Sequence, residues 1–303
     1  MTTRPVMVCA ASLRSWHKPR QARVAGEAYV SMTIFVFFKV TGDDMGNSKP
    51  SLFFFSLLFL TFPIFAQEIT SSYFKLDVTD WTIIDTSKTK YTPESILNEC
   101  DNYYREIYEY LFDRIPEVTG DKKLLRIVDY QNEFSTNHVS GKCLYITNST
   151  INNNKPPLAH EITHLIIYDP NLISYSEGLA DYFQNRFTPD DKQFILYKGN
   201  CHRKLKVFWT YYYSDTNALN IINGKLNSGF YLEAESLVNY LICKYGVQEF
   251  LEYFYGGGYK SYNDIFSISK EDLKKEWVEY VLKQEPDSVW ILNWDKINSL
   301  YKQ

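Results

Sequence analysis

The sequence of 303 residues is poor in glycine and proline, with 13 and 11 residues respectively. This scarcity argues against a disordered chain or a collagen-like repeat, and no internal repeat or low-complexity run is present. None of the five cysteines has a C-x-x-C spacing, so a cysteine zinc site is not expected. Clusters of lysine and arginine are also missing, which argues against nucleic acid as a partner. Since 45% of the residues are hydrophobic, a folded domain is expected.

One apolar run stands out near the front of the chain. Residues 51–65 are almost entirely apolar, Lys49 precedes them and Ala66 follows, which is the pattern of a secretory signal peptide. A membrane-spanning helix is the alternative, but the run is shorter than the roughly 20 residues that a span needs and contains Pro63. We therefore expect cleavage after Ala66 and an exported protein, periplasmic or secreted, without a stable membrane span.

This signal divides the chain into three parts. Because export signals stand at the start of a chain, translation is expected to begin at Met45, with a signal peptide at 45–66 and a non-native extension at 1–44. Residues 1–44 contribute +3 to the formal charge and Lys49 one more, so residues 67–303 carry about −8. Their length suits one large domain or two small ones.

Four cysteines follow the expected cleavage site. They are Cys100, Cys143, Cys201 and Cys243. Export permits one or two disulfides, with three possible full pairings. Four free thiols are an equally ordinary outcome, and the sequence does not choose between the two.

The most specific motif is His160-Glu161-Ile162-Thr163-His164, an H-E-x-x-H pattern. On a helix this spacing places both imidazoles on one face, one turn apart, where they can hold one zinc ion. Glu161 lies beside that face, placed to take a proton from a metal-bound water rather than to ligate the metal. Apolar residues at 158–159 and 165–167 indicate a buried helix, and prolines lie on both sides of it.

A zinc hydrolase needs a third protein ligand. The metzincin pattern would require glycine at 167 and histidine at 170, where this chain has Ile167 and Pro170. The other pattern places a glutamate on a second helix after a short turn. By that pattern we expect the third ligand to be Glu177. Asp181 follows one helical turn later and is placed to accept a hydrogen bond from the free ring nitrogen of a zinc-bound histidine. The alternative is an amphipathic helix whose two acids, Glu177 and Asp181, face water.

These motifs resemble those of the gluzincin metallopeptidases, particularly the peptidase-MA-like proteins, in which H-E-x-x-H is followed by W/Y-x-S-E-G-x-A. The second motif reads S-E-G-L-A-D-Y-F over 176–183. Two later segments are also similar: 231–246 resembles a helix of that family ending in Y-G, and 266–277 resembles its closing helix with a tryptophan. The resemblance covers most of residues 140–285, although only the zinc motifs are specific.

The resemblance implies a zinc peptidase acting on peptides or proteins, with Zn²⁺ as cofactor. In that family the residues corresponding to His160, His164 and Glu177 ligate zinc, and the residue corresponding to Glu161 is the general base. The implied fold is an α+β, thermolysin-like gluzincin domain over 67–303, with a mixed N-terminal sheet and its edge strand, a zinc helix, and a mostly helical C-terminal part. Cleavage specificity and oligomeric state are not defined by the sequence.

The order of elements also favours an α+β fold. Strands are expected over 73–85, 123–129 and 141–147, and a helix is expected to begin at Thr92-Pro93-Glu94 and to run to the neighbourhood of Phe112. In the resembled fold a strand at the position of 141–147 forms the sheet edge that pairs with extended substrate. A plain internal strand is the alternative.

Helices dominate the rest of the chain. One is expected over 232–245, ending at Gly246, and a last helix begins at Ser269 with Asp272 as its capping partner. That last helix should carry three side chains on its inner face, namely Trp277, Tyr280 and Val281. Strands first and helices after are typical of the α+β class.

Two points of function stay open in the sequence. A peptidase needs a donor that stabilises the oxyanion, and five side chains are candidates by chain position. These are Tyr211, Tyr212, Tyr213, Tyr231 and His202. An inactive zinc-binding scaffold is the alternative function, which Glu161 argues against and a fourth ligand such as His202 would favour. A third hypothesis is an accidental motif in an exported helical adaptor.

Overall fold

The computed structural model describes residues 9–12, 33–36, 68–129, 137–187, 200–226, 231–256 and 261–301. The chain forms two compact units, Met1–Gln67 and Glu68–Gln303. In the first unit, β1 (Cys9–Ser12) pairs antiparallel with β2 (Thr33–Val36). The signal peptide expected at 45–66 lies outside the described residues, as does most of the extension expected at 1–44.

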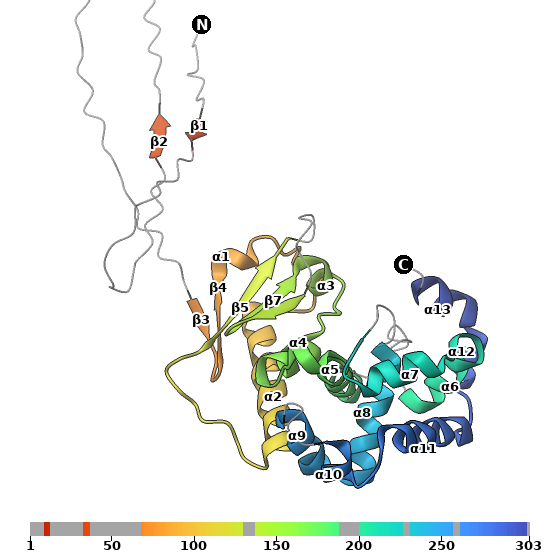
Figure 1. Cartoon of the computed structure of the whole chain (residues 1–303). Helices are drawn as coiled ribbons and strands as arrows, with labels where there is room; N and C mark the ends of the chain where they lie inside the picture. The colour runs from red at the N-terminus through yellow and green to blue at the C-terminus, as the bar shows by residue number, and fades with distance from the viewer. Residues whose placement is uncertain are drawn as a thin grey trace, which may run out of the picture. The chain divides into compact units, whose positions relative to one another are not determined.

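The second unit begins with a mixed five-stranded sheet (Figure 1). In spatial order its strands are β3 (Glu68–Thr70), β4 (Phe74–Asp77), β5 (Lys123–Val128), β7 (Cys143–Thr147) and β6 (His138–Ser140). The three central strands are parallel, and the two edge strands, β3 and β6, run antiparallel to their neighbours. The expected mixed sheet is confirmed, and so are strands close to 123–129 and 141–147.

One expectation about the sheet is corrected, and one open alternative is decided. The strand expected over 73–85 stops at Asp77, because the Asp77 side chain accepts a hydrogen bond from Thr79 N and caps the short helix α1 (Val78–Trp81). The strand near 141–147, β7, is internal, since β5 and β6 pair with it on either side. The edge on this side is β6, which the sequence did not reveal.

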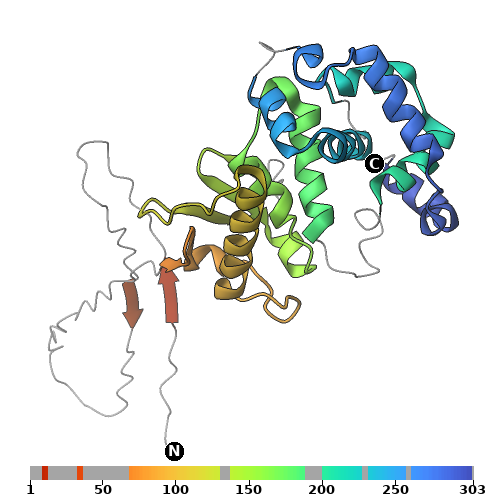
Figure 2. The same cartoon turned by 90° about the horizontal axis from the view of Figure 1, so that it is seen from below.

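One face of the sheet is covered by α2 (Pro93–Phe112) and α4 (Leu158–Ile166) (Figures 1 and 2). Thr92 and Ser95 form a capping box that starts α2 where the sequence predicts a helix start. Helix α2 packs on β3 and β4, α4 packs on β6 and β7, and the two helices contact each other. The short helix α3 (Asn148–Asn152) connects β7 towards α4. The sheet therefore fixes one side of the helix that carries the H-E-x-x-H motif.

The remainder of the second unit is helical, as expected. Its elements are η1 (Pro170–Leu172), α5 (Ile173–Phe187), α6 (Cys201–Tyr212), α7 (Asp215–Ile222), α8 (Tyr231–Tyr245), α9 (Val247–Tyr255), α10 (Tyr262–Phe266), α11 (Lys270–Lys283), α12 (Ser288–Leu292) and α13 (Trp294–Tyr301). Helix α8 contacts α5, α6, α7 and α9, so it is the centre of this part. The α+β class predicted from the sequence is thus confirmed.

Helices α8 and α11 largely match their predictions. Helix α8 ends before Gly246, whose φ of 101° lies in the left-handed region, and Ser269 caps α11. Trp277 and Val281 are buried as expected, but Tyr280 is 38% exposed. Helix α11 is not the last helix, because α12 and α13 follow it. The exposure of Tyr280 was missed because local periodicity does not show how much surface a neighbouring element covers.

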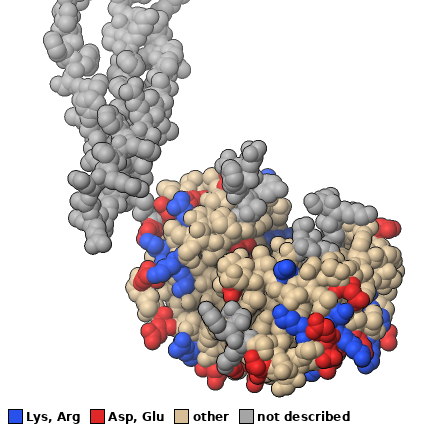
Figure 3. Space-filling view, in the orientation of Figure 1, with Lys and Arg blue, Asp and Glu red and all other residues tan. Residues whose placement is uncertain are grey.

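Three further properties involve several elements of the described structure. All four cysteines after the expected cleavage site are free thiols, with Cys100 and Cys201 buried, so the free-thiol alternative holds. Within the described ranges, no helix combines the length and apolar character needed to cross a membrane. Acidic and basic side chains lie intermixed on the face shown in Figure 3.

Candidate metal centre

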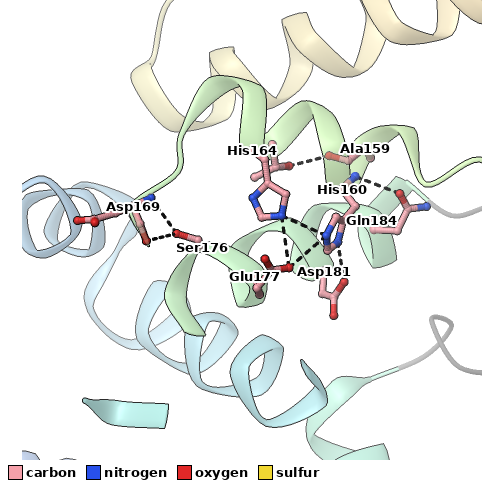
Figure 4. A network of polar contacts seen from close by, with 9 residues as sticks. Ala159, His160, His164, Asp169, Ser176, Glu177, Asp181 and Gln184 are labelled. Carbon is pink, nitrogen blue, oxygen red and sulfur yellow. Dashed lines mark hydrogen bonds and ion pairs between the residues drawn. The ribbon is translucent and has the colours of Figure 1, made fainter. Parts of the chain in front are cut away.

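The site is built on α4, whose nine residues carry the whole H-E-x-x-H motif. Ala159 and Ile162 are fully buried on the core side of this helix. His160 and His164 lie one turn apart, and their Nε2 atoms are 3.1 Å from each other (Figure 4). The packing of the apolar residues therefore orients the helix so that both imidazoles point to the same place.

The second helix of the site, α5, brings Glu177 to the two histidines. Its Oε2 atom lies 3.3 Å from Nε2 of His160 and 3.3 Å from Nε2 of His164 (Figure 4). In the part of the chain that the structure describes, these three residues are the only group of histidine, cysteine and acidic side chains close enough to hold one metal ion. The alternative of an α5 acid facing open water does not apply to Glu177.

The spacing of the three atoms can be compared with what zinc requires. Zinc binds histidine nitrogen and carboxylate oxygen at about 2.0–2.1 Å in a tetrahedral arrangement, which separates neighbouring ligand atoms by roughly 3.3 Å. The triangle formed by the Nε2 atoms of His160 and His164 and Oε2 of Glu177 has sides of 3.1, 3.3 and 3.3 Å. The residues thus fit one zinc ion with a fourth position left for water or substrate.

Asp181 binds the opposite side of one imidazole. Its Oδ1 atom lies 2.8 Å from Nδ1 of His160, so Nε2 of that ring is the nitrogen directed at the triangle. Burial disfavours the charged form of His160, but hydrogen bonds to Asp181 and Glu177 outweigh it and raise the pKa to about 10. Since metal ligands are neutral imidazoles, a cation entering this site has to displace a proton from His160.

The charge of Glu177 is set by the same contacts. Burial alone would raise the pKa of its carboxyl group, but hydrogen bonds from His160 and His164 outweigh burial and lower it to about 2. Glu177 is therefore a carboxylate at neutral pH, which is the form that ligates a metal.

The neighbours of Glu177 in the S-E-G motif have separate structural roles. The Ser176 hydroxyl accepts a hydrogen bond from Asp169 N at 3.0 Å and donates one to Asp169 O at 3.1 Å, which ties α5 to the turn after α4 (Figure 4). A Cβ at Gly178 would lie 2.4 Å from the backbone oxygen of Ala234 in α8. The motif thus joins α4, α5 and α8 around the ligand Glu177.

Glu161, the expected general base, is only 5% exposed. Burial raises the pKa of its carboxyl group, while the nearby His160 and His164 lower it. The net direction is upward, so Glu161 holds a proton more readily than a carboxyl group in water does. A buried carboxyl group whose pKa is raised in this way is suited to accept a proton as a general base.

Four of the five candidates for an oxyanion donor are engaged elsewhere. The ring of Tyr211 stacks on Trp294, with centroids 4.4 Å apart. The hydroxyls of Tyr212 and Tyr213 bind Asn298 at 2.5 Å and Asp215 at 2.6 Å. His202 is buried, with Nδ1 2.8 Å from Ser236 Oγ and Nε2 3.1 Å from Asn239 Oδ1, so it is no fourth ligand.

Tyr231, the first residue of α8, is the candidate that lies near the site. Burial raises the pKa of its hydroxyl, and the carboxylates of Glu177 and Asp181 raise it further because they repel a phenolate. The side chain is still 43% exposed. Tyr231 thus combines a protonated hydroxyl, access to solvent and proximity to the candidate ligands.

Tyr168 and His138 are among the residues near the site that the sequence did not reveal. Tyr168, 49% exposed, packs edge-on against His164 with ring centroids 5.2 Å apart. His138, on the edge strand β6, stacks face to face on Tyr145 at 4.5 Å and interacts electrostatically with Glu161. Tyr168 lies beyond the end of α4 at Ile166, so helical spacing gave no signal for it. No signal identified His138, because a strand of three residues has no readable period.

The chain matches no protein-family model, no curated protein and no solved structure. What the centre can do therefore follows from its own residues and their geometry.

Proposed function

We propose that this chain is a zinc-dependent peptidase with a gluzincin-type, thermolysin-like catalytic domain. The observation that carries the proposal is the triangle of two imidazole nitrogens and one carboxylate oxygen at 3.1–3.3 Å spacing. The contact between His160 and Asp181 supports it, because histidines that bind zinc commonly donate their second nitrogen to a carboxylate. The edge strand β6, the helix α4 beside it and the helical C-terminal part agree with this fold type.

When bound at the triangle, zinc would supply Lewis-acid polarisation of a carbonyl group and of water. Glu161 would accept the proton of the attacking water and then return it to the leaving amine. Its burial and raised pKa suit the first step, since a base of higher pKa takes a proton more readily. Breaking a peptide bond in this way requires both transfers, and one carboxyl group beside His160 can perform them in turn.

Two other side chains would support the reaction. Asp181 would hold the imidazole of His160 in one orientation through its 2.8 Å contact with Nδ1. Tyr231 would donate its hydroxyl proton in a hydrogen bond to the carbonyl oxygen as negative charge develops on it. Its raised pKa keeps that proton available over the neutral range.

The substrate would be an extended peptide or a protein segment. Among the described strands β6 lies at the edge of the sheet and contacts α4, and an extended peptide could pair with it by backbone hydrogen bonds. His138 lies on this strand and close to Glu161, so it would contact the substrate near the scissile bond.

The test is cleavage of a diverse peptide pool by the purified, zinc-loaded protein, with Glu161→Gln as the matched control. Gln keeps the shape of the side chain and leaves the three candidate ligands untouched. We expect chelator-sensitive cleavage by the wild type and a loss of at least about 10²-fold in the variant, with one bound zinc per chain in both. Equal zinc binding without any difference in cleavage would favour an inactive scaffold, and absence of zinc binding would contradict the metal centre itself.

A further inference from the structure

Helix α4 begins without a side-chain cap of its own. Pro157 occupies the N-cap position and offers no side-chain hydrogen bond. The first N–H groups of a helix have no partner within the helix, so others must satisfy them. His160 N–H belongs to this first turn and points away from the helix body.

Gln184 supplies the missing partner from a different helix. Its Oε1 atom accepts a hydrogen bond from His160 N at 3.1 Å (Figure 4). The two residues are 24 positions apart, so the contact exists only because α5 packs along α4. The backbone of a candidate zinc ligand is thus bound by a side chain of the second helix.

The residues of α5 that contact His160 form a regular series. Glu177, Asp181 and Gln184 are spaced four and three positions apart, which places them on one face of the helix. Glu177 faces Nε2, Asp181 faces Nδ1, and Gln184 binds the backbone amide. Two of these contacts orient the ring, whereas the third fixes the point of the backbone from which the ring projects.

We propose that Gln184 is a positioning residue of the metal centre, which anchors the start of α4 and thereby sets the place of the His160 imidazole in the ligand triangle. The proposal rests on the proposed zinc site, and it adds a residue that neither the motif spacing nor the ligand set reveals. A ligand displaced by a few tenths of an ångström binds zinc less well, because tetrahedral coordination tolerates little error in distance.

The test compares two substitutions of nearly equal size. Gln184→Met removes the acceptor and keeps the length, whereas Gln184→Glu keeps an acceptor, and negative charge is favourable at a helix N-terminus. We expect Gln184→Met to raise the zinc Kd by about 10-fold and Gln184→Glu to remain within about twofold of the wild type. Zinc Kd is measured by competition with a chromophoric chelator. Arg186→Met, at an exposed position of α5, is the matched control and should not change the Kd.

If Gln184 contributed to packing alone, Gln184→Met and Gln184→Glu would bind zinc with the same affinity. That result would overturn the proposal. If Gln184→Met does not fold, the test is hydrogen exchange of the His160 backbone amide in the wild type. Strong protection of the His160 amide would support the anchor, and rapid exchange in the folded protein would overturn it. If the wild type and Gln184→Met bind zinc with equal affinity, only the role of Gln184 is refuted. If the wild type binds no zinc, the metal centre is refuted as well.

Discussion

Nδ1 of His160 lies 2.8 Å from Oδ1 of Asp181, and that contact determines which ring nitrogen faces the ligand triangle. The carboxylate comes from one turn beyond Glu177 on the same helix. One face of α5 therefore supplies a candidate ligand and the group that orients another. Because the orienting carboxylate acts through a charge-assisted hydrogen bond, its charge matters as well as its shape.

Replacing Asp181 by Asn should weaken zinc binding by about 10-fold, and replacement by Ala by up to about 100-fold. Asn keeps the shape but accepts a weaker hydrogen bond from Nδ1–H, and Ala accepts none. Chelator competition measures the effect, with Asp215→Asn as a control at an acid of α7 that binds Tyr213. Equal zinc affinity in wild type and Asp181→Ala would show that His160 needs no partner.

Replacing Tyr231 by Phe should lower kcat by about 10²-fold and leave zinc affinity unchanged, because only the hydroxyl that stabilises the oxyanion is lost. The measurement is kcat and KM on a peptide identified from the cleaved pool. Tyr211→Phe is the matched control, since the Tyr211 ring stacks on Trp294 in another region. A similar kcat for both variants would mean that another donor serves the oxyanion.

Replacing Gly178 by Ala should lower the free energy of unfolding by about 2–4 kcal/mol. The new Cβ would lie 2.4 Å from Ala234 O and 2.9 Å from Val238 Cγ2, so α8 has to move away from α5. Urea denaturation of the metal-free protein measures the loss. Gly120→Ala is the control, because no heavy atom lies within 4 Å of a Cβ at that position. Equal stabilities for the two variants would show that the α5–α8 contact adjusts without cost.

Glu233 should make stability depend on pH. Its Oε1 accepts a hydrogen bond from Trp209 Nε1 at 2.5 Å, and its Oε2 is buried with no hydrogen-bond partner among the described residues. Burial raises the pKa of this carboxyl group from 4.5 to about 7. The folded state therefore holds this proton more tightly than the unfolded state. The stability gained from Glu233 is complete below about pH 4.5 and is lost as the pH rises through 7.

The Glu233→Gln variant cannot ionise at this position. Relative to the wild type, its free energy of unfolding should rise by up to about 3 kcal/mol between pH 4.5 and pH 8. Urea titrations across this range measure the difference, with Glu94→Gln as the comparison at an exposed position of α2. Parallel stability curves for wild type and Glu233→Gln would contradict the prediction.

The sequence by itself determined the features that depend on local geometry. The spacing of His160 and His164 follows from 3.6 residues per helical turn, so the pair could be placed on one face before any fold was known. The helix start at Thr92 and the helix stop at Gly246 likewise follow from groups within a few residues. The α+β class followed from the order of such elements along the chain.

The tertiary structure decided every feature that joins distant segments. It brought Glu177 to 3.3 Å from both histidines, separated Tyr231 from the other oxyanion candidates, and paired Gln184 with the amide of His160. It also made the three-residue strand β6 the sheet edge. No period or cap in the sequence encodes these contacts, because they depend on how helices and strands pack, and packing is set by the shapes of many side chains together.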